Sequence, residues 1–272
     1  MEFSDEETFC QKEAKKYIEE HKDELIRKFI LDKKPLRINT LSFFMAGSPG
    51  AGKTEFTNNY MHTTLDKNDK DLKKILEGEN IDINDVECLF VKIDVDEIRA
   101  FIPHYKKTDT AVNQKGNAHV VQSAANRGLD ILRNFCFKND ISFLHDGTFG
   151  NYKTMRELVR KSVLKQRAVH IYYLYLDPLK AWEFTKAREF LEGRNIVKDK
   201  FISQFFDSQE NIDKIKTEFG DKVKINCILK NNDNKVEEIL LNQPNIAGFL
   251  EVKYNSGIIR KYTKEDLSGL LR

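Results

Sequence analysis

Two kinds of segment alternate along this 272-residue chain: nearly continuous apolar runs, and stretches in which apolar residues recur at helical spacing. Nearly continuous apolar runs occur at residues 41–46 and in CLFVKIDVD, ISFLHDGTF, AVHIYYLYLDP and KVKINCIL. Helical patterns lie between and after these runs, at residues 53–62, 118–138, 153–166, 179–192 and 200–219. Because strands covered on both faces are apolar almost throughout, this alternation predicts an α/β fold with a mostly parallel sheet flanked by helices.

The two ends of the chain show different patterns. Residues 5–33 carry apolar side chains at helical spacing with charges between them, and Pro35 ends the pattern. Near the other end, residues 246–254 and 257–262 resemble short strands and precede a last short helix. The polar segment 63–87 predicts a surface insertion.

These patterns predict three parts. Residues 1–38 form an N-terminal helical extension, residues 39–230 form the core, and residues 231–272 form a small C-terminal extension. A helical lid is expected at about 180–210 within the core.

The first apolar run leads into a glycine-rich loop, GSPGAGKT, which fits GxxxxGK[ST] at every fixed position. Glycines let successive backbone N–H groups converge on phosphate oxygens, and the following helix adds the positive end of its dipole. Lys53 is expected to reach the β- and γ-phosphates, and the Thr54 hydroxyl to bind Mg²⁺. The sequence therefore predicts a P-loop NTPase fold that binds ATP or GTP through Gly47, Ser48, Pro49, Gly50, Ala51, Gly52, Lys53 and Thr54.

Two later apolar runs end in carboxylates. The run LFVKIDVDEIRAF ends in Asp94 and Asp96, and ISFLHDGTFGN delivers Asp146. Strand ends in open α/β sheets face the ligand crevice, so one carboxylate of the first pair is expected to hold Mg²⁺ and the other to accept a proton from a substrate hydroxyl. Asp146 resembles a metal-binding Walker B carboxylate, and Thr148 follows it. Asp94, Arg99, Asp146 and Thr148 are the candidate substrate-binding residues.

Two arginines follow the fourth apolar run, in KAREFLEGRNIVKDKF. Phosphoryl transfer concentrates negative charge on the γ-phosphate oxygens, and arginines that close over them stabilise the transition state. In small kinases such arginines lie on a mobile lid. Arg188 and Arg194 are therefore candidate catalytic residues, together with Lys53.

Composition narrows the choice of partner. The formal net charge of +2 counts against nucleic acid, whose binding normally needs clustered Lys and Arg. No apolar stretch approaches the roughly 18 to 20 residues needed to cross a bilayer. Because the N-terminus also lacks a signal-peptide pattern, we expect a cytoplasmic protein that binds a small molecule.

Four motifs together resemble a zeta-toxin-type kinase, a bacterial P-loop family similar to chloramphenicol phosphotransferase and polynucleotide kinase. They are GSPGAGKTEF, KIDVDEIRAFIPHY, HDGTFGN and AREFLEGRNIVKDKF, and the resemblance covers about residues 42–206. It implies phosphorylation of the 3-hydroxyl of UDP-N-acetylglucosamine, toxicity, and a small helical antitoxin as partner. By this likeness Asp96 is the general base, Lys53, Arg188 and Arg194 clamp the phosphates, and Thr148 touches substrate.

The chain departs from the family pattern at two positions. The family commonly has Glu where this chain has Asp146, and a sugar-contacting Glu expected after His119 falls on Leu129, next to Asp130. The alternatives are therefore a kinase for an antibiotic, a nucleoside or a polynucleotide 5′ end, or a nucleotide-dependent binding module. Residues 5–33 are either a built-in cover or antitoxin-like element, or a packing extension of the core.

Overall fold

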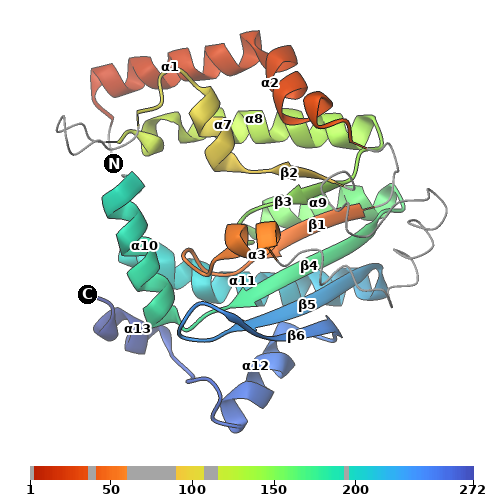
Figure 1. Cartoon of the computed structure of the whole chain (residues 1–272), viewed down its shortest axis with the longest axis vertical. Helices are drawn as coiled ribbons and strands as arrows, with labels where there is room; N and C mark the ends of the chain where they lie inside the picture. Colours follow the sequence, from red (N-terminus) through yellow and green to blue (C-terminus); the bar gives the residue numbers. More distant parts are fainter. Residues whose placement is uncertain (1–2, 36–40, 60–89, 107–115, 193–195) are drawn as a thin grey trace.

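The computed structural model describes residues 3–35, 41–59, 90–106, 116–192 and 196–272. A six-stranded sheet runs through the molecule in the order β2-β3-β1-β4-β5-β6 (Figure 1). Neighbours are parallel from β2 to β5, and β6 is antiparallel to β5, which confirms the mostly parallel α/β prediction. The strands are β1 (Leu41–Ala46), β2 (Val91–Ile93), β3 (Phe143–His145), β4 (Ala168–Tyr175), β5 (Val223–Lys230) and β6 (Val236–Gln243).

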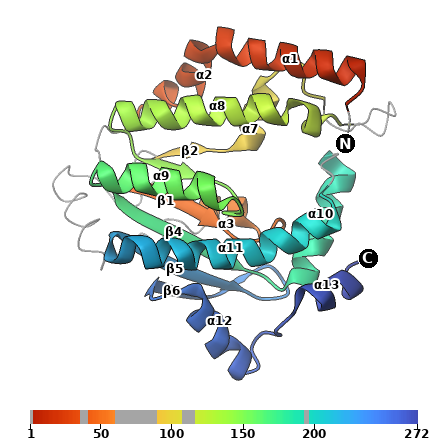
Figure 2. The ribbon, with the colours of Figure 1, turned by 180° about the vertical axis from the view of Figure 1, so that it is seen from behind.

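Helices cover both faces of this sheet. Helix α3 (Lys53–Asn59) lies in front of the strands in Figure 1, and α9 (Tyr152–Leu164) and α11 (Lys198–Phe219) lie in front of them in the reverse view of Figure 2. Helices α7 (Val95–Phe101) and α8 (Ala118–Lys138) lie near the β2 edge. Coverage on both faces explains why every residue of β1 is buried.

Helix predictions in the core were accurate. The helix expected at 118–138 has those bounds, and α9, α10 (Pro178–Glu192) and α11 begin and end within two residues of their predicted limits. Helix α3 ends at Asn59 in the described part, and the expected continuation to residue 62 lies outside it, as does the polar segment 63–87. Within the described ranges, no helix is long and apolar enough to cross a membrane.

The predicted strands of the tail were wrong. Residues 246–254 belong to helix α12 (Ile246–Asn255), residues 257–262 form no strand, and the last helix, α13 (Lys264–Leu270), is confirmed. The buried positions of α12 include Ile246, Phe249 and Leu250, which follow a helical period rather than a strand alternation. Its first turn is also capped from a distance, because Asp213 on α11 accepts hydrogen bonds from the N–H groups of Ile246 and Ala247.

Strand β6 was not predicted. It lies within the range expected to form the C-terminal extension, yet it pairs with β5 and is the edge strand of the main sheet. Its sequence, VEEILLNQ, mixes polar and apolar residues and leaves every position at least partly exposed. Edge strands carry this polar content because one side of their backbone faces solvent, which weakens the strand signal in the sequence.

The N-terminal segment forms two helices rather than one. Helix α1 (Asp5–Glu20) begins at a Ser4–Glu7 capping box, and α2 (Lys22–Phe29) follows after His21, with a short 3₁₀ turn, η1 (Leu31–Lys33), behind it. Both helices pack on α8 and bury Ala14, Ile18, Leu25 and Phe29 in the main core. They lie on the outer side of α8, away from the loop that joins β1 to α3 (Figure 1).

Candidate functional site

The glycine-rich loop connects β1, the central strand, to α3. Gly47 has φ 131°, Gly50 φ 76° and Gly52 φ 75°, all in the region that favours glycine. A Cβ on Gly47 would lie 2.5 Å from the carbonyl oxygen of Leu174, and a Cβ on Gly50 would lie 2.1 Å from that of Ala181. The loop is therefore pressed against the end of β4 and the start of α10, and only glycine fits at these contacts.

Lys53 folds back over this loop. Its Nζ donates hydrogen bonds to the carbonyl oxygens of Gly47, at 3.1 Å, and Ser48, at 2.7 Å. Burial lowers the pKa of Lys53 to about 8; the negative charge of Asp146 opposes this change and the positive charge of Arg188 adds to it. The ammonium thus lies inside the loop, close to charged groups from two other elements.

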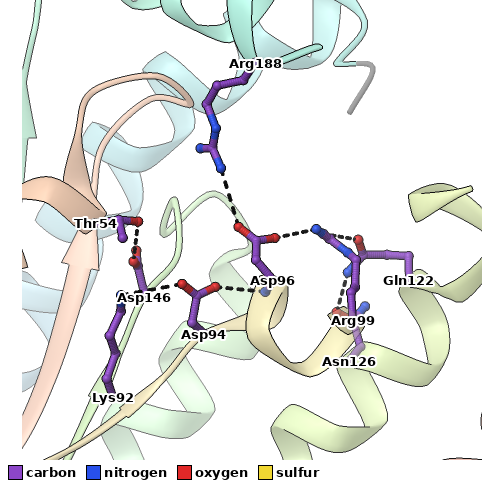
Figure 3. Close-up of polar contacts among 9 residues, drawn as sticks. All are labelled: Thr54, Lys92, Asp94, Asp96, Arg99, Gln122, Asn126, Asp146 and Arg188. Carbon is purple, nitrogen blue, oxygen red and sulfur yellow. Dashed lines mark hydrogen bonds and ion pairs between the residues drawn. The ribbon is translucent and has the colours of Figure 1, made fainter. Parts of the chain in front are cut away.

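Thr54 and Asp146 form the second part of the site. The Thr54 hydroxyl donates to Asp146 Oδ2 at 3.0 Å, which joins the first turn of α3 to the end of β3 (Figure 3). Burial raises the pKa of Asp146, and nearby Asp94 raises it further, while Lys53, Lys92 and the Thr54 hydrogen bond oppose these effects. Burial thus makes the charge on this carboxylate unfavourable by itself, so a cation beside it would be stabilising.

These oxygen donors suit Mg²⁺. In P-loop enzymes the ion is held by the loop Ser or Thr and by a carboxylate at a strand end, and it keeps waters and phosphate oxygens as further ligands. Among the residues that the structure describes, no group of three or more His, Cys, Asp or Glu side chains could hold a metal. The Thr54–Asp146 pair fits an ion that takes most of its ligands from the nucleotide and water.

Asp94 and Asp96 have different surroundings although they are two residues apart. Asp94 follows β2 and accepts a hydrogen bond from the Asp96 N–H at 2.8 Å, so it is the N-cap of α7. Its other oxygen lies 3.6 Å from the Lys92 ammonium. Asp96 instead extends toward α10, where its Oδ2 lies 3.7 Å from Arg188 Nη2 (Figure 3).

Arg99 connects Asp96 to α8. One guanidinium nitrogen, Nη1, pairs with Asp96 Oδ1, and Nη2 donates to Gln122 Oε1 at 2.6 Å. The Gln122 amide donates in turn to Asn126 Oδ1 at 2.8 Å. Gln122 and Asn126 were missed in the sequence, because a Gln or Asn within a long amphipathic helix belongs to no motif.

The other residues considered in the sequence are Thr148, Arg194 and Leu129. Thr148 lies beside the phosphate loop, since its carbonyl oxygen accepts the Gly47 N–H at 3.3 Å and its hydroxyl accepts the Gly150 N–H. Arg194 lies outside the described residues. Leu129, where the family Glu was expected, is buried, and the neighbouring Asp130 pairs with Arg133.

Lys230, which was also not predicted from the sequence, supports the phosphate loop from the end of β5. Lys230, at the end of β5, is buried and its ammonium lies 3.0 Å from Glu55 in the first turn of α3. A Cβ on Gly52 would lie 2.4 Å from that ammonium. The third glycine of the motif therefore makes room for a buried cation.

Taken together, the carboxyl end of the sheet gathers a phosphate loop with its lysine, a hydroxyl–carboxylate pair and the Asp96–Arg188 pair. This combination can bind a nucleoside triphosphate and present a carboxylate to an acceptor group next to the γ-phosphate.

Comparisons with known proteins identify the family and the fold of this chain. The family model described as zeta toxin matches residues 86–241. Its match begins after the phosphate loop, which is supported by its own motif and shape. A search of curated proteins found no match.

Solved structures show the same fold. A chain of the PezAT chromosomal toxin–antitoxin system of the human pathogen Streptococcus pneumoniae matches with a TM-score of 0.51 and 16% identity, over 100% of this chain and 89% of that one. The AvrRxo1-ORF1:AvrRxo1-ORF2 structure with sulphate ions matches with a TM-score of 0.53 and 11% identity, over 85% and 66%. The same complex with ATP has a TM-score of 0.52 and 10% identity, over the same shares. Given the family match over more than half of its length, the chain belongs to the zeta toxin family of P-loop kinases.

Proposed function

We propose that this protein transfers the γ-phosphate of ATP or GTP to a hydroxyl of a small sugar-containing molecule, with the 3-hydroxyl of UDP-N-acetylglucosamine as the preferred acceptor. The observation that carries the proposal is the position of Asp96. Its carboxylate extends from the start of α7, after β2, toward Arg188, at the same edge of the sheet as the phosphate loop that follows β1. A hydrolytic switch would need to position a water, whereas this arrangement suits an acceptor alcohol.

Each residue then has a role in the transfer. Asp96 accepts the proton of the acceptor hydroxyl as the hydroxyl oxygen forms a bond to the γ-phosphorus and the bond to the β-phosphate oxygen breaks. Lys53 and Arg188 stabilise the charge on the transferring group and the departing diphosphate. Arg194 is proposed to assist from the lid, and Thr148 to contact the acceptor. Mg²⁺, held by Thr54 and Asp146, would supply further charge neutralisation on the phosphates.

The proposed partner and cellular location are based on the family to which the chain belongs. One solved relative comes from a toxin–antitoxin system, so we propose a small helical antitoxin that inhibits this protein. A kinase of this kind would act in the cytoplasm, where ATP and nucleotide sugars are available.

A direct assay tests the proposal. The protein is incubated with ATP, Mg²⁺ and UDP-N-acetylglucosamine, and the sugar nucleotide is examined by mass spectrometry for one added phosphate. Asp96→Asn should abolish product while leaving binding of a fluorescent ATP analogue largely intact. Glu97→Gln, an exposed neighbour on the same helix, is the matched control and should keep full activity. Full activity in the Asp96 variant would remove this residue from the mechanism.

A different acceptor is the second candidate. Near Asp96, α8 presents the amides Gln122 and Asn126, and the position of the expected family Glu is a buried leucine. An amide can both donate and accept hydrogen bonds, whereas an ionised Glu can only accept, so this surface would select a different pattern of acceptor groups. If UDP-N-acetylglucosamine gains no phosphate, a metabolite extract that includes antibiotics and nucleosides should be screened. Nucleotide binding without any phosphorylated product would favour a binding module.

A further inference from the structure

We propose that Arg99 and Gln122 are positioning residues that hold the Asp96 carboxylate in one orientation, with Oδ1 anchored and Oδ2 left to take the proton. This inference rests on the proposed function of Asp96 as the base. It assigns to Arg99 a role different from direct contact with substrate.

The first observation is the difference in exposure along this contact. The Arg99 side chain is 10% exposed, whereas that of Asp96 is 29% exposed. A guanidinium that is largely buried needs hydrogen-bond acceptors with fixed positions, and its planar fork matches a carboxylate well. Arg99 is thus the fixed member of the pair, and Asp96 is the more exposed member.

The second observation is how the outer end of Arg99 is held. Gln122 Oε1 accepts from Arg99 Nη2 at 2.6 Å, and the amide group of Gln122 donates to Asn126 at 2.8 Å. These two bonds determine which end of the amide faces Arg99 (Figure 3). Because Gln122 is neutral, it satisfies an N–H group without competing with Asp96 for the positive charge.

The third observation is that α8 and α7 are packed closely. A Cβ on Gly128 of α8 would lie 2.7 Å from Ile98 Cγ2 on α7, and 3.5 Å from Leu25 Cδ2 on α2. The two helices therefore approach each other at a glycine, and α2 covers the crossing. Gln122 therefore has a fixed position on α8. Its hydrogen bond to Arg99 fixes the guanidinium, and the guanidinium in turn fixes the Asp96 carboxylate.

This arrangement distinguishes the two oxygens of Asp96. Oδ1 faces Arg99, and Oδ2 lies 3.7 Å from Arg188 Nη2 on α10. Arg188 is half-exposed, so its contact can be exchanged for a phosphate oxygen. When that happens Oδ2 loses its contact with Arg188 and can turn to an acceptor hydroxyl, while Oδ1 keeps its contact with Arg99.

The chain of contacts from Gln122 through Arg99 to Asp96 is called the relay below. Four variants test it: Arg99→Met, Gln122→Leu, the double variant and Gln122→Glu. With UDP-N-acetylglucosamine as acceptor, we expect kcat to fall roughly 10- to 100-fold in Arg99→Met and less in Gln122→Leu, because a misplaced base loses its alignment. The double variant should fall no further than Arg99→Met alone, because Gln122 acts only through Arg99. Binding of a fluorescent ATP analogue should be unchanged in all four.

Gln122→Glu separates positioning from packing. It keeps the shape of the side chain but adds a carboxylate that competes for Arg99, so kcat should fall although the protein folds normally. Asn134→Leu, at an exposed position on the same helix, should retain the activity of the unaltered protein. Multiplicative losses in the double variant, or a Gln122→Glu variant as active as the unaltered protein, would overturn the relay.

The relay and the proposed function can fail separately. If the unaltered protein phosphorylates the acceptor and Asp96→Asn is inactive, multiplicative losses of kcat in the double variant count against the relay alone. If the unaltered protein yields no product, crystal structures of Arg99→Met and Gln122→Glu decide. An Asp96 side chain that keeps its rotamer in both would overturn the relay, and a changed rotamer would support it.

Discussion

The Arg188 guanidinium and the Asp96 carboxylate lie 3.7 Å apart, and this ion pair joins α10 to the first turn of α7 across the end of the sheet. Both side chains are partly exposed, so the pair contributes only about 0–1 kcal/mol. A triphosphate carries several negative charges and can take Arg188 from Asp96 at little cost. The pair therefore places the proposed phosphate-binding arginine and the proposed base next to each other.

Loss of Arg188 should reduce catalysis more than binding. An arginine that stabilises the transferring phosphoryl group contributes roughly 10³ to 10⁵ in kcat, and part of this is retained if Arg194 assists. We expect Arg188→Ala to lower kcat at least about 100-fold, with a much smaller change in nucleotide affinity. Steady-state kinetics and binding of a fluorescent ATP analogue measure the two effects. Lys186→Ala, at a residue on the same helix whose ammonium pairs with nearby Glu189, is the control; an equal loss there would point to general damage to α10.

Lys53 should make both stability and nucleotide binding depend on pH. Its pKa is lowered to about 8 from an ordinary value of 10.5, chiefly by burial. Between these values the unfolded chain binds more protons than the folded chain, so the free energy of unfolding contributed by this residue rises with pH. Urea denaturation at pH 7.5, 8.5 and 9.5 should show this rise, and Lys53→Met should lack it.

Nucleotide affinity should change in the opposite direction. The phosphates need the charged ammonium, so above about pH 8 binding must take up a proton, and affinity should fall by up to about tenfold per pH unit. Calorimetry in buffers of different ionisation enthalpy measures the proton uptake. A pH-independent affinity from pH 7 to 9.5 would contradict a role for the Lys53 charge.

Asp146 should lower the stability of the free protein while it contributes to turnover. Its pKa is raised, first by burial and then by Asp94, so above that raised pKa the charged form destabilises the free protein. This penalty declines as the pH falls through the raised pKa. Asp146→Asn should therefore raise Tm by about 2–4 °C for each 1 kcal/mol relieved, while turnover with Mg²⁺ and ATP falls at least about tenfold. A lower Tm with unchanged turnover would show that this carboxylate has only a structural role.

Gly50 should be irreplaceable for steric reasons. Its φ is 76°, and an added Cβ would lie 2.1 Å from the Ala181 carbonyl oxygen at the start of α10. Gly50→Ala must move the loop or the helix, and nucleotide affinity should fall about 100-fold or more. Gly220→Ala is the matched control, because Gly220 also has positive φ, 57°, but an added Cβ meets nothing within 4 Å. Because Gly220 combines φ 57° with ψ −132°, a conformation that other residues rarely adopt, a backbone strain of about 1–3 kcal/mol should then appear in its unfolding curve.

The N-terminal helices should behave as part of the core. Leu25 on α2 is fully buried against α8, and Leu25→Ala should lower the free energy of unfolding by about 2–5 kcal/mol. Leu31→Ala, at a residue that is 43% exposed, should change it by less than about 0.5 kcal/mol. Urea denaturation measures both. Equal, small effects would favour a detachable cover.

Local patterns were sufficient where the physical cause is local. The 21-residue helix α8 was located to the residue, because its apolar face repeats along its whole length. Where the cause is distant, local patterns failed: Ile246–Asn255 is rich in apolar residues that also suit a strand, and the carboxylate of Asp213, from another helix, caps it as a helix.

The candidate site shows the same division. The amino-acid sequence alone determined the phosphate loop, its lysine and threonine, and the presence of carboxylates at strand ends, because these depend on a few neighbouring residues and on the strand they follow. Only the tertiary structure decided that Asp94 caps a helix while Asp96 faces Arg188, and that Gln122 reaches Asp96 through Arg99. Side-chain direction and contacts between distant helices depend on packing of the whole sheet and its helices, which no local pattern records.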